Sequence, residues 1–311
     1  MYLFTNEQFY IKTTPFANTF SMYKKFLFSL FFCIALPFFA FSSCQKNSAE
    51  PPSVQELSSE NFDKPTPLPI FPSEIDPAQP PAPSNIWDVS DVDISEIDTA
   101  RKLISFTFDD SPARTLENIL AVFADFNEHN PDCKASATLF CNGYRFDKQT
   151  PHLLATALAL GFDLGNHTYS HPDLTLLSDE EIQKEITRTD ALLSRADGKE
   201  QHLFRPPFGK IAEAQKGTLS SPIINWTIDT LDWKDTEEEQ IYQTVMSQKF
   251  SGAIVLMHDG YENTVSALKR LLPDLKSAGY QVVSLSKISK AHNCPFRNGK
   301  EYIRARKQST V

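Results

Sequence analysis

Two histidines and a nearby carboxylate in this chain have the types and spacing of a metal site. His167 and His171 are four residues apart, so both imidazoles can face one ion from a helical turn or a tight loop. Such a pair is often only structural, but Asp110 offers an anionic oxygen as well. Two neutral imidazoles and one carboxylate form a known catalytic zinc set that leaves a position open for water. We therefore interpret Asp110, His167 and His171 as metal ligands that lower the pKa of bound water.

Asp109 adjoins Asp110 at the end of an apolar run. Two vicinal carboxylates commonly form a solvated turn, but here Phe106 and Phe108 flank them, which indicates partial burial. Burial of two like charges is expensive without a cation. A metal at Asp110 and the guanidinium of Arg205 beside Asp109 would offset that cost. We interpret Asp109 as the general base that takes a proton from metal-bound water.

His258 ends a second apolar run, Ile254–Met257, and has two interpretations. On its own it could be a core histidine that is satisfied by a hydrogen bond. As a general acid it would protonate the leaving amine or alkoxide, and the carboxylate of Asp232 would favour the imidazolium that this role requires. Trp233 and Leu256 would then wall an apolar slot for a methyl group, although both could be ordinary core residues.

The segment Arg205–Gly209, with the sequence RPPFG, predicts a rigid turn. Its glycine permits a positive φ, so a backbone N–H in this turn could face a developing oxyanion. A simple loop without a catalytic role is the alternative.

The elements that must position these residues alternate between strand and helix from about residue 101. This alternation implies parallel βαβ units, and about seven of them suggest a barrel-like sheet. The candidate residues fall at or just after predicted strand ends, where barrels of this kind carry their catalytic groups. Strands are expected at 103–108, 137–141, 162–166, 202–204, 223–228, 253–257 and 281–284. Helices are expected after Ser111-Pro112 as N-cap and first residue, at 153–160, from a Ser178/Glu181 capping box to Gly198, and at 262–278.

Five segments, taken in order, resemble the polysaccharide deacetylase family, that is, the NodB-homology domain of carbohydrate esterase family 4. They are Thr107–Asp110 (TFDD), His167–Pro172 (HTYSHP), Arg205–Gly209 (RPPFG), Asp229–Trp233 (DTLDW) and Leu256–His258 (LMH). The resemblance covers about residues 101–290. One departure is Ser111, where glycine often stands, and it bears on the shape of that loop and not on the two aspartates.

The resemblance implies a distorted (β/α)7 barrel of the α/β class and a divalent metal, usually Zn²⁺, with Co²⁺ or Mn²⁺ as alternatives. It also implies removal of N- or O-linked acetyl groups from sugars. By motif position Asp110, His167 and His171 would hold the metal, Asp109 would be the base and His258 the acid. Arg205 would orient Asp109, Asp232 would tune His258, and the Phe208 backbone N–H would help to stabilise the oxyanion.

Three functions are therefore weighed for the chain. The first is a deacetylase that acts on an N-acetylglucosamine-containing polysaccharide, either peptidoglycan or a chitin-like polymer. The second is an O-acetyl esterase on xylan, but an amine leaving group needs protonation more, so His258 favours the amide reaction. The third is a non-catalytic glycan-binding lipoprotein, which the retention of every catalytic residue disfavours.

The N-terminal part predicts export. Lys24 and Lys25 precede the apolar run Phe26–Phe41, and Cys44 follows two serines, as in a lipoprotein signal. Residues 1–44 are thus expected to be a leader, with Met22 as a plausible true start and Cys44 as the lipidation site. We expect a membrane-anchored lipoprotein of the cell envelope. A secreted or periplasmic protein is one alternative, since Phe41 matches the signal poorly, and a retained membrane anchor is another.

The remaining composition bounds the other regions. Residues 45–100 are rich in proline, serine and acidic residues and are expected to be a tether. Residues 101–290 would be the catalytic domain, and 291–311 a basic tail that forms a solvated end or, alternatively, a patch for an anionic polymer. A net charge of -9 argues against nucleic acid as a partner, and a monomer is expected.

Three cysteines, Cys133, Cys141 and Cys294, remain after the leader. An odd number argues against a complete disulfide framework. One bridge, such as Cys133 to Cys294, stays open, whereas Cys141 is expected to be a small buried thiol.

Overall fold

The computed structural model describes residues 85–308. The predicted leader with Met22 and Cys44, and the predicted tether as far as residue 84, lie outside the described residues. Within the described part, no helix combines the length and the apolar character that a membrane crossing needs.

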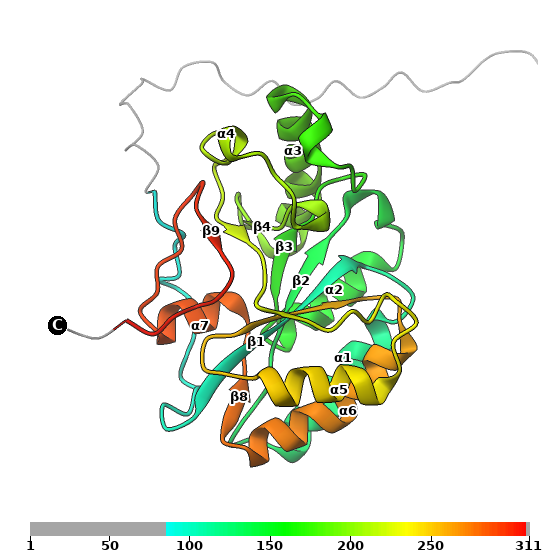
Figure 1. The fold of residues 1–311 in the computed structure, drawn as a ribbon, viewed down its shortest axis with the longest axis vertical. Coiled ribbons are helices and arrows are strands. Elements are labelled where there is room, and N and C mark those ends of the chain that lie inside the picture. The colour runs from blue at the N-terminus through cyan, green and yellow to red at the C-terminus, as the bar shows by residue number, and fades with distance from the viewer. Residues whose placement is uncertain (1–84, 309–311) are drawn as a thin grey trace, which may run out of the picture. The chain divides into compact units, whose positions relative to one another are not determined.

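Nine strands form one sheet in which every hydrogen-bonded pair of strands is parallel (Figure 1). The order is β6-β7-β1-β2-β3-β4-β5-β9, and β8 pairs with the beginning of β1. The strands are β1 (Lys102–Ser111), β2 (Thr138–Cys141), β3 (Asp163–Asn166), β4 (Leu203–Phe204), β5 (Ile223–Ile224), β6 (Ile228–Asp229), β7 (Ile254–His258), β8 (Tyr280–Val282) and β9 (Glu301–Tyr302).

The sheet curls into an incomplete barrel. Seven strands run from β6 round to β5 in the sheet order, yet only residues 225–227 separate these two strands along the chain. So short a link spans at most roughly 14 Å, so the two strands must approach each other. In the described structure they do not pair with each other. The second edge of β5 pairs with β9, so β6 and β9 are the two ends of the sheet and the barrel stays open between them. This arrangement confirms the predicted distorted (β/α)7 barrel.

Helices cover the outside of the sheet because each has one apolar face. In α1, for example, Leu116, Ile119, Leu120 and Phe123 recur at helical spacing and are all buried. In the lower part of Figure 1, α5 and α6 lie side by side in front of α1. The helices are α1 (Leu116–His129), α2 (Thr150–Ala159), α3 (Asp179–Asp197), α4 (Glu213–Lys216), α5 (Glu238–Gln248), α6 (Glu262–Ser277) and α7 (Leu285–Ala291), with short 3-10 helices η1 (Gly143–Arg145), η2 (Leu174–Leu176) and η3 (Pro207–Gly209).

The limits of α3 follow the predicted local signals. The Ser178 hydroxyl accepts the Glu181 backbone N–H at 3.3 Å, and the Glu181 carboxylate accepts the Ser178 backbone N–H at 2.9 Å. The helix then ends at Gly198, whose φ of 74° is in the left-handed region that glycine adopts without strain. Both predictions for this helix are confirmed.

The predicted start of the first helix at Ser111-Pro112 is wrong. Ser111 still belongs to β1, where it pairs with Cys141 of β2. The helix begins only at Leu116, because the buried carboxylate of Asp259 holds the intervening loop: its oxygens accept the Ala113 N–H at 2.6 Å and the Thr115 hydroxyl at 2.7 Å. The single strand predicted at 223–228 is likewise wrong, because residues 225–227 divide it into β5 and β6.

Packed structure extends beyond residues 101–290 on both sides. Trp87 is buried, and its backbone N–H donates to the backbone carbonyl of buried Phe296 at 2.8 Å. Further on, β9 pairs with β5, and Ala305 is buried. Residues 85–100 therefore differ from the predicted tether, and much of 291–308 differs from a solvated tail, because a few apolar side chains in these polar segments bury themselves on the barrel.

The three described cysteines, Cys133, Cys141 and Cys294, are buried and unbridged, so the Cys133–Cys294 bridge is not formed. Burial raises the pKa of each thiol, which keeps it protonated and unreactive. They act as small apolar side chains of the core.

Candidate active site

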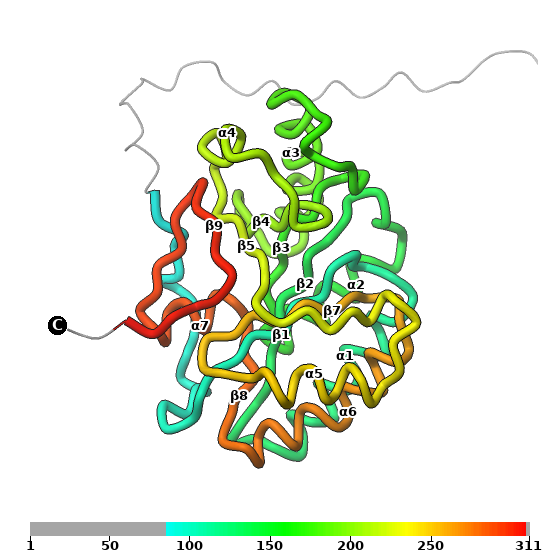
Figure 2. The backbone as a smooth tube through the Cα atoms, viewed as in Figure 1, coloured from blue at the N-terminus to red at the C-terminus, as the bar shows by residue number. Residues whose placement is uncertain are grey.

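The candidate residues meet at the carboxyl ends of the strands. Asp109 of β1 and His258 of β7 are direct register partners on neighbouring strands. His167 follows the last residue of β3, and Arg205 follows the last residue of β4. In Figure 2 the chain segments after β1, β2, β3 and β7 can be followed to this same edge. Parallel strands thus bring segments that are far apart in sequence to one place, as the strand-end positions predicted.

Three candidate metal ligands lie together at this edge. One ligand atom from each of Asp110, His167 and His171 lies within 4.8 Å of the others. The Nε2 atom of His171 is 3.7 Å from Oδ1 of Asp110, and the two histidine ring centroids are 5.0 Å apart. Two imidazoles and a carboxylate suit Zn²⁺ and similar divalent ions. The donor set therefore fits one divalent cation.

His167 is held in the state that a ligand needs. Its Nδ1 lies 2.7 Å from the carbonyl oxygen of Arg205, so the ring is oriented with Nε2 toward the cluster. The side chain is almost completely buried, and this burial lowers the pKa of the imidazole despite the nearby carboxylates. A neutral ring is the form that binds a metal.

Asp109 is buried beside a cation. Arg205 Nη1 donates to Asp109 Oδ1 at 2.7 Å, while Asp109 Oδ2 faces His167 Nε2 at 3.6 Å. Burial alone would raise the pKa of this carboxyl, but the Arg205 guanidinium, helped by His258, holds the pKa below its usual value. The carboxylate therefore stays ionised with one oxygen occupied and the other directed into the site.

Arg205 is a fully buried arginine whose donors are used. Besides Asp109, its guanidinium donates to the Thr107 hydroxyl at 2.7 Å and to the carbonyls of Ile224 at 2.8 Å and Asn225 at 3.3 Å. The group also lies 4.1 Å from the centre of the Phe140 ring. These contacts fix the guanidinium, and through it they fix Asp109.

His258 is paired with Asp232 as the sequence led us to expect. Asp232 Oδ1 lies 2.8 Å from His258 Nδ1, and Oδ2 accepts the His258 backbone N–H at 2.7 Å. The Thr264 hydroxyl donates to the same Oδ2 at 2.7 Å. Burial would lower the pKa of His258, but the hydrogen bond and the charge of Asp232 raise it above its usual value. The imidazolium is thereby favoured, and Nε2 stays available to the cavity.

A cavity of about 370 Å³ joins these groups. Its apolar walls include Phe208, Trp226, Trp233 and Leu256, and Tyr261 closes another side. The Phe208 ring, which is 58% exposed, lies 4.8 Å from the His171 ring. The predicted substrate-binding residues Phe208, Trp233 and Leu256 thus all line the cavity that holds the polar groups.

Unusual backbone conformations are concentrated in four of the five motifs. Seven described non-glycine residues have a positive φ, and five of them are Asp110, Thr168, His171, Phe208 and Leu231. Positive φ costs energy for most residues and persists where the surroundings enforce it, which is common at functional sites. Phe208 has a φ of 59° beside Gly209 at 68°, so the left-handed turn predicted for the glycine includes its neighbour.

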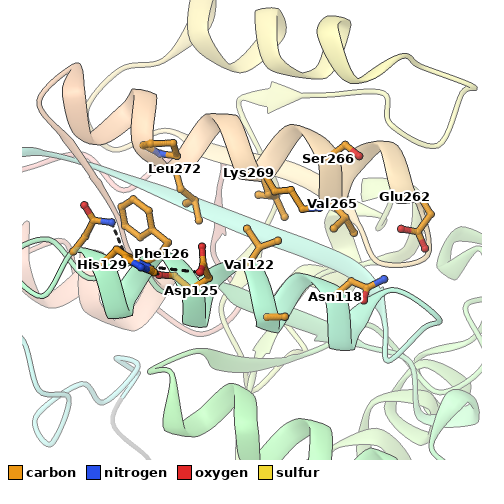
Figure 3. A pocket seen from close by; sticks show the side chains of 14 residues that line it. Asn118, Val122, Asp125, Phe126, His129, Glu262, Val265, Ser266, Lys269 and Leu272 are labelled. Carbon is orange, nitrogen blue, oxygen red and sulfur yellow. Dashed lines mark hydrogen bonds and ion pairs between the residues drawn. The ribbon is translucent and has the colours of Figure 1, made fainter.

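A larger cavity, of about 640 Å³, lies outside the barrel between α1 and α6 (Figure 3). Val122 from α1 and Val265 from α6 face it, with polar side chains such as Asp125 and Lys269 around them. None of the predicted site residues lines it, and its polar groups form no cluster of metal-ligand type in the described structure. Volume alone therefore does not identify the chemical site.

The sequence did not point to several residues that shape the site. Tyr261 and Trp226 line the cavity, Thr264 orients Asp232, and the Asn142 side chain donates to the His167 carbonyl at 2.6 Å. Trp226 stands within the segment predicted as a strand at 223–228, and its large aromatic side chain was a usable signal. Tyr261, Thr264 and Asn142 come together with the site only through the fold.

The geometry agrees with comparisons to known proteins. Residues 96–221 match the family described as Polysaccharide deacetylase. The chain is 33% identical over 193 residues to the peptidoglycan-N-acetylmuramic acid deacetylase PdaC of Bacillus subtilis, covering 62% of this chain and 40% of that protein. It is also 33% identical over 202 residues to a peptidoglycan-N-acetylglucosamine deacetylase of Bacillus cereus, covering 62% of this chain and 91% of that protein. The chain spans only part of the first curated relatives that it matches, 40%, 66% and 44% of their lengths.

Two solved structures are similar as well. The structure of PdaC from Bacillus subtilis superposes with a TM-score of 0.58 at 32% identity, covering 63% of this chain and 94% of that chain. A family 4 acetyl xylan esterase from Clostridium thermocellum, solved with a cobalt ion, has a TM-score of 0.60 at 26% identity, covering 65% of this chain and 98% of that chain.

Proposed function

This chain belongs to the polysaccharide deacetylase family, and we propose that it hydrolyses N-acetyl groups of an N-acetylglucosamine-containing glycan, either peptidoglycan or a chitin-like polymer. The observation that carries the proposal is one cavity with a base, an acid and a ligand cluster. Asp109 and His258 stand on the neighbouring strands β1 and β7, and each is held by a partner, Arg205 and Asp232 respectively. The ligand cluster of Asp110, His167 and His171 lies beside them.

The ligand cluster is proposed to bind a divalent cation, with Zn²⁺ favoured and Co²⁺ or Mn²⁺ as alternatives. Such an ion supplies Lewis acidity, which makes water a better nucleophile near neutral pH and polarises an acyl oxygen. The neutral state of His167 and its hydrogen bond to the Arg205 carbonyl support this assignment.

Asp109 is proposed as the general base. Its Oδ1 is occupied by Arg205, so Oδ2 can accept a proton from a water molecule that attacks the acetamide carbonyl. The lowered pKa of this carboxyl keeps it ionised before the reaction. The Arg205 contacts hold the carboxylate in one orientation, which reduces the entropy lost on reaching the transition state.

His258 is proposed as the general acid. Asp232 holds Nδ1, so Nε2 can donate a proton to the amine nitrogen as its bond to the acyl carbon breaks. The raised pKa of His258 favours the imidazolium that is needed at neutral pH. The products are acetate and a free amine on the sugar. The Phe208 backbone N–H is proposed to help stabilise the oxyanion, and Trp233 and Leu256 to enclose the acetyl methyl group.

An O-acetyl esterase activity on xylan is the second candidate, supported by the similarity to an acetyl xylan esterase. With the same base and acid, a water molecule would attack an ester carbonyl, but an alkoxide leaves more readily than an amide nitrogen. The raised pKa of His258 and its fixed pairing with Asp232 therefore favour the amide substrate. A non-catalytic glycan-binding role is less favoured, because base, acid and ligand set are all present.

Export to the cell envelope is part of the proposal. It rests on the predicted leader and on Cys44 as a lipidation site, which would anchor the protein to a membrane near its polymer. Mass analysis of the protein isolated from cells would test it, since a lipidated N-terminal Cys44 is expected and an unprocessed N-terminus would contradict it.

Acetate release by the full chain tests the function. Chitin oligomers, peptidoglycan and acetylated xylan are offered to the chelator-treated protein, with and without added Zn²⁺, Co²⁺ or Mn²⁺. We expect release that depends on metal and falls about 10²–10⁴-fold in Asp109→Asn. The metal content of this variant is the control, because its ligand set is intact. Release from xylan alone would favour the esterase, and no release from any polymer by the metal-loaded protein would overturn the proposal.

A further inference from the structure

A second cavity, of about 360 Å³, lies at the same edge of the sheet as the active site. Arg114 of the loop after β1 and Arg145 of η1, which follows β2, both line it, together with the start of α2. Since β7, β1 and β2 are neighbouring strands, the loops that follow them are also neighbours. We refer to the cavity lined by Arg114 and Arg145 as the arginine pocket.

The arginine pocket is connected to the active site through the loop after β7. Arg114 Nε donates to the Gly260 carbonyl at 2.8 Å, and the next residue, Tyr261, lines the active-site cavity. Gly260 N–H in turn donates to the Thr115 hydroxyl, at 2.6 Å. The loops after β1 and β7 are therefore fixed to each other, with the arginine on one side and the active site on the other.

A second connection runs through the loop after β2. The backbone N–H of Gly143 donates to the Thr168 carbonyl at 3.1 Å, and that of Tyr144 donates to the Tyr169 carbonyl at 2.9 Å. Thr168 and Tyr169 lie between the two histidines of the ligand cluster. Arg145 is thus one residue from a contact with the cluster segment, and its guanidinium lies 5.1 Å from the Tyr144 ring, which is half exposed.

The two guanidinium groups of the arginine pocket are not paired with a carboxylate. Within the described residues, neither arginine forms an ion pair, and the buried Nε of Arg145 has no hydrogen-bond acceptor. Two carboxylates also line the pocket, so its formal charges balance, but neither carboxylate meets a guanidinium. Asp147 is engaged at the start of α2, where its Oδ1 accepts the N–H groups of Gln149 at 2.9 Å and Thr150 at 3.0 Å. Glu117 is exposed. Both arginines are therefore free to bind a carboxylate of a ligand.

We propose that the arginine pocket binds a carboxylate carried by the glycan, on a unit beside the one that loses its acetyl group. This inference rests on the proposed function and narrows its substrate to an anionic N-acetylated glycan in preference to a neutral chitin-like one. A guanidinium binds a carboxylate through two parallel hydrogen bonds, which fixes orientation as well as position.

The arginine pocket and the active-site cavity share no lining residue, and the base, the acid and the ligand cluster belong to the active-site cavity. A carboxylate held by the arginines would therefore lie beside the reacting unit and not against the base and the acid. A strand with alternating charged and neutral sugars would then be placed with the neutral acetamide at the base and the acid. In peptidoglycan such a carboxylate comes either from the free lactyl group of the muramyl sugar or from its peptide.

Steady-state kinetics of the metal-loaded full chain test the proposal. Three substrates are compared: glycan strands freed of peptide, which carry the lactyl carboxylate; strands that retain the peptide; and neutral chitin oligomers. The readout is the ratio of kcat/KM for the anionic glycan over the neutral one. We expect this ratio to fall about tenfold in Arg145→Gln and in Arg114→Gln, mainly through KM, and to fall in wild type as salt rises.

Two further variants make the outcome decisive. Glu117→Gln removes the competing carboxylate and is expected to raise the ratio about two- to threefold, opposite in sign to the arginine variants. Lys148→Gln removes an exposed charge from the same loop without lining the pocket, and should leave the ratio as in wild type. A loss seen only with peptide-free strands identifies the lactyl group, and one seen only with peptide-bearing strands identifies the peptide.

The outcomes separate this inference from the proposed function. Equal ratios in wild type and both arginine variants would overturn the subsite while acetate release still supported a deacetylase. Binding of anionic strands that depends on both arginines, measured by calorimetry, without acetate release would keep the subsite and overturn the deacetylase. A ratio that falls equally in Lys148→Gln would also overturn the subsite, since only general surface charge would then be acting.

Discussion

Two histidines in this molecule, His258 and His202, are paired with aspartates, and they differ in whether a ring nitrogen remains free. His258 meets Asp232 at 2.8 Å through Nδ1, and its other side belongs to the active-site cavity. His202 directly precedes β4, and both of its ring nitrogens have a carboxylate partner. Asp190 lies 2.9 Å from Nδ1, and Asp197 lies 3.2 Å from Nε2. The His202 side chain is completely buried.

The comparison shows that a raised pKa does not by itself identify a catalytic histidine. Burial lowers the pKa of both imidazoles, and in both the aspartates outweigh it, so that both pKa values are above the usual range. His202 has no free nitrogen, so its charge can only stabilise the fold. His258 keeps one nitrogen for a substrate, so its charge can be transferred as a proton.

The largest effect is expected when the free nitrogen is removed. His258→Ala should lower kcat for acetate release by about 10²–10⁴-fold, because the amine would leave unprotonated. The melting temperature should fall less than in His202→Ala, because the buried Asp232 keeps the backbone N–H of residue 258 and the Thr264 hydroxyl as donors. If the loss of activity in His258→Ala merely matched the fraction of unfolded protein, the catalytic role of His258 would be contradicted.

Removal of the enclosed histidine should act on stability. His202→Ala leaves two carboxylates near each other, with Asp197 almost fully buried, and we expect a loss of about 3–5 kcal/mol in the free energy of unfolding. Denaturant titration measures it. The folded fraction should keep wild-type kcat, and a folded but inactive His202→Ala would show that this histidine also serves the site.

Asp232→Asn is expected to have an intermediate effect, roughly a 10–100-fold fall in kcat. The hydrogen bond and charge that raise the pKa of His258 are lost, so the acid deprotonates at lower pH. The alkaline limb of the pH profile of kcat should therefore move to lower pH. An unmoved limb, with activity reduced at every pH, would instead indicate that Asp232 only positions the ring.

The smallest effect concerns the pH dependence of stability. Since the pKa of His202 is raised above its usual 6.5 in the folded protein, its contribution is complete below that value. The contribution is lost as the pH rises through the raised pKa. The difference in melting temperature between wild type and His202→Gln should therefore shrink from pH 6 to pH 9, and a difference that grows over this range would contradict the assignment.

The sequence predicted the site better than it predicted the boundaries of the domain. Residues such as Asp109, His167 and His258 are recognisable by type and by their place after apolar runs, so motif order was enough to assemble them. Arg205 was paired with Asp109, and Asp232 with His258, by charge arguments that need no coordinates.

Other features depend on contacts that a local pattern does not encode. The two-residue strand β9 is too short for any periodicity and is defined only by its pairing with β5, and the strand predicted at 223–228 is divided into β5 and β6. Trp87 and Phe296 lie in polar segments, and they are buried only because the fold brings both into one hydrophobic cluster. Helices α5 and α7 were not predicted, and α1 starts late because Asp259, far along the chain, holds the loop before it.

Arg205 couples the end of β5 mechanically to the proposed base. Its guanidinium donates to the carbonyls of Ile224 and Asn225, where β5 ends, and to Asp109 of β1. A shift of the chain at 224–225 would therefore move the guanidinium, and with it the Asp109 carboxylate. Lengthening the link at 225–227 would leave the pairs β5–β9 and β6–β7 in place, yet it would loosen the orientation of the base.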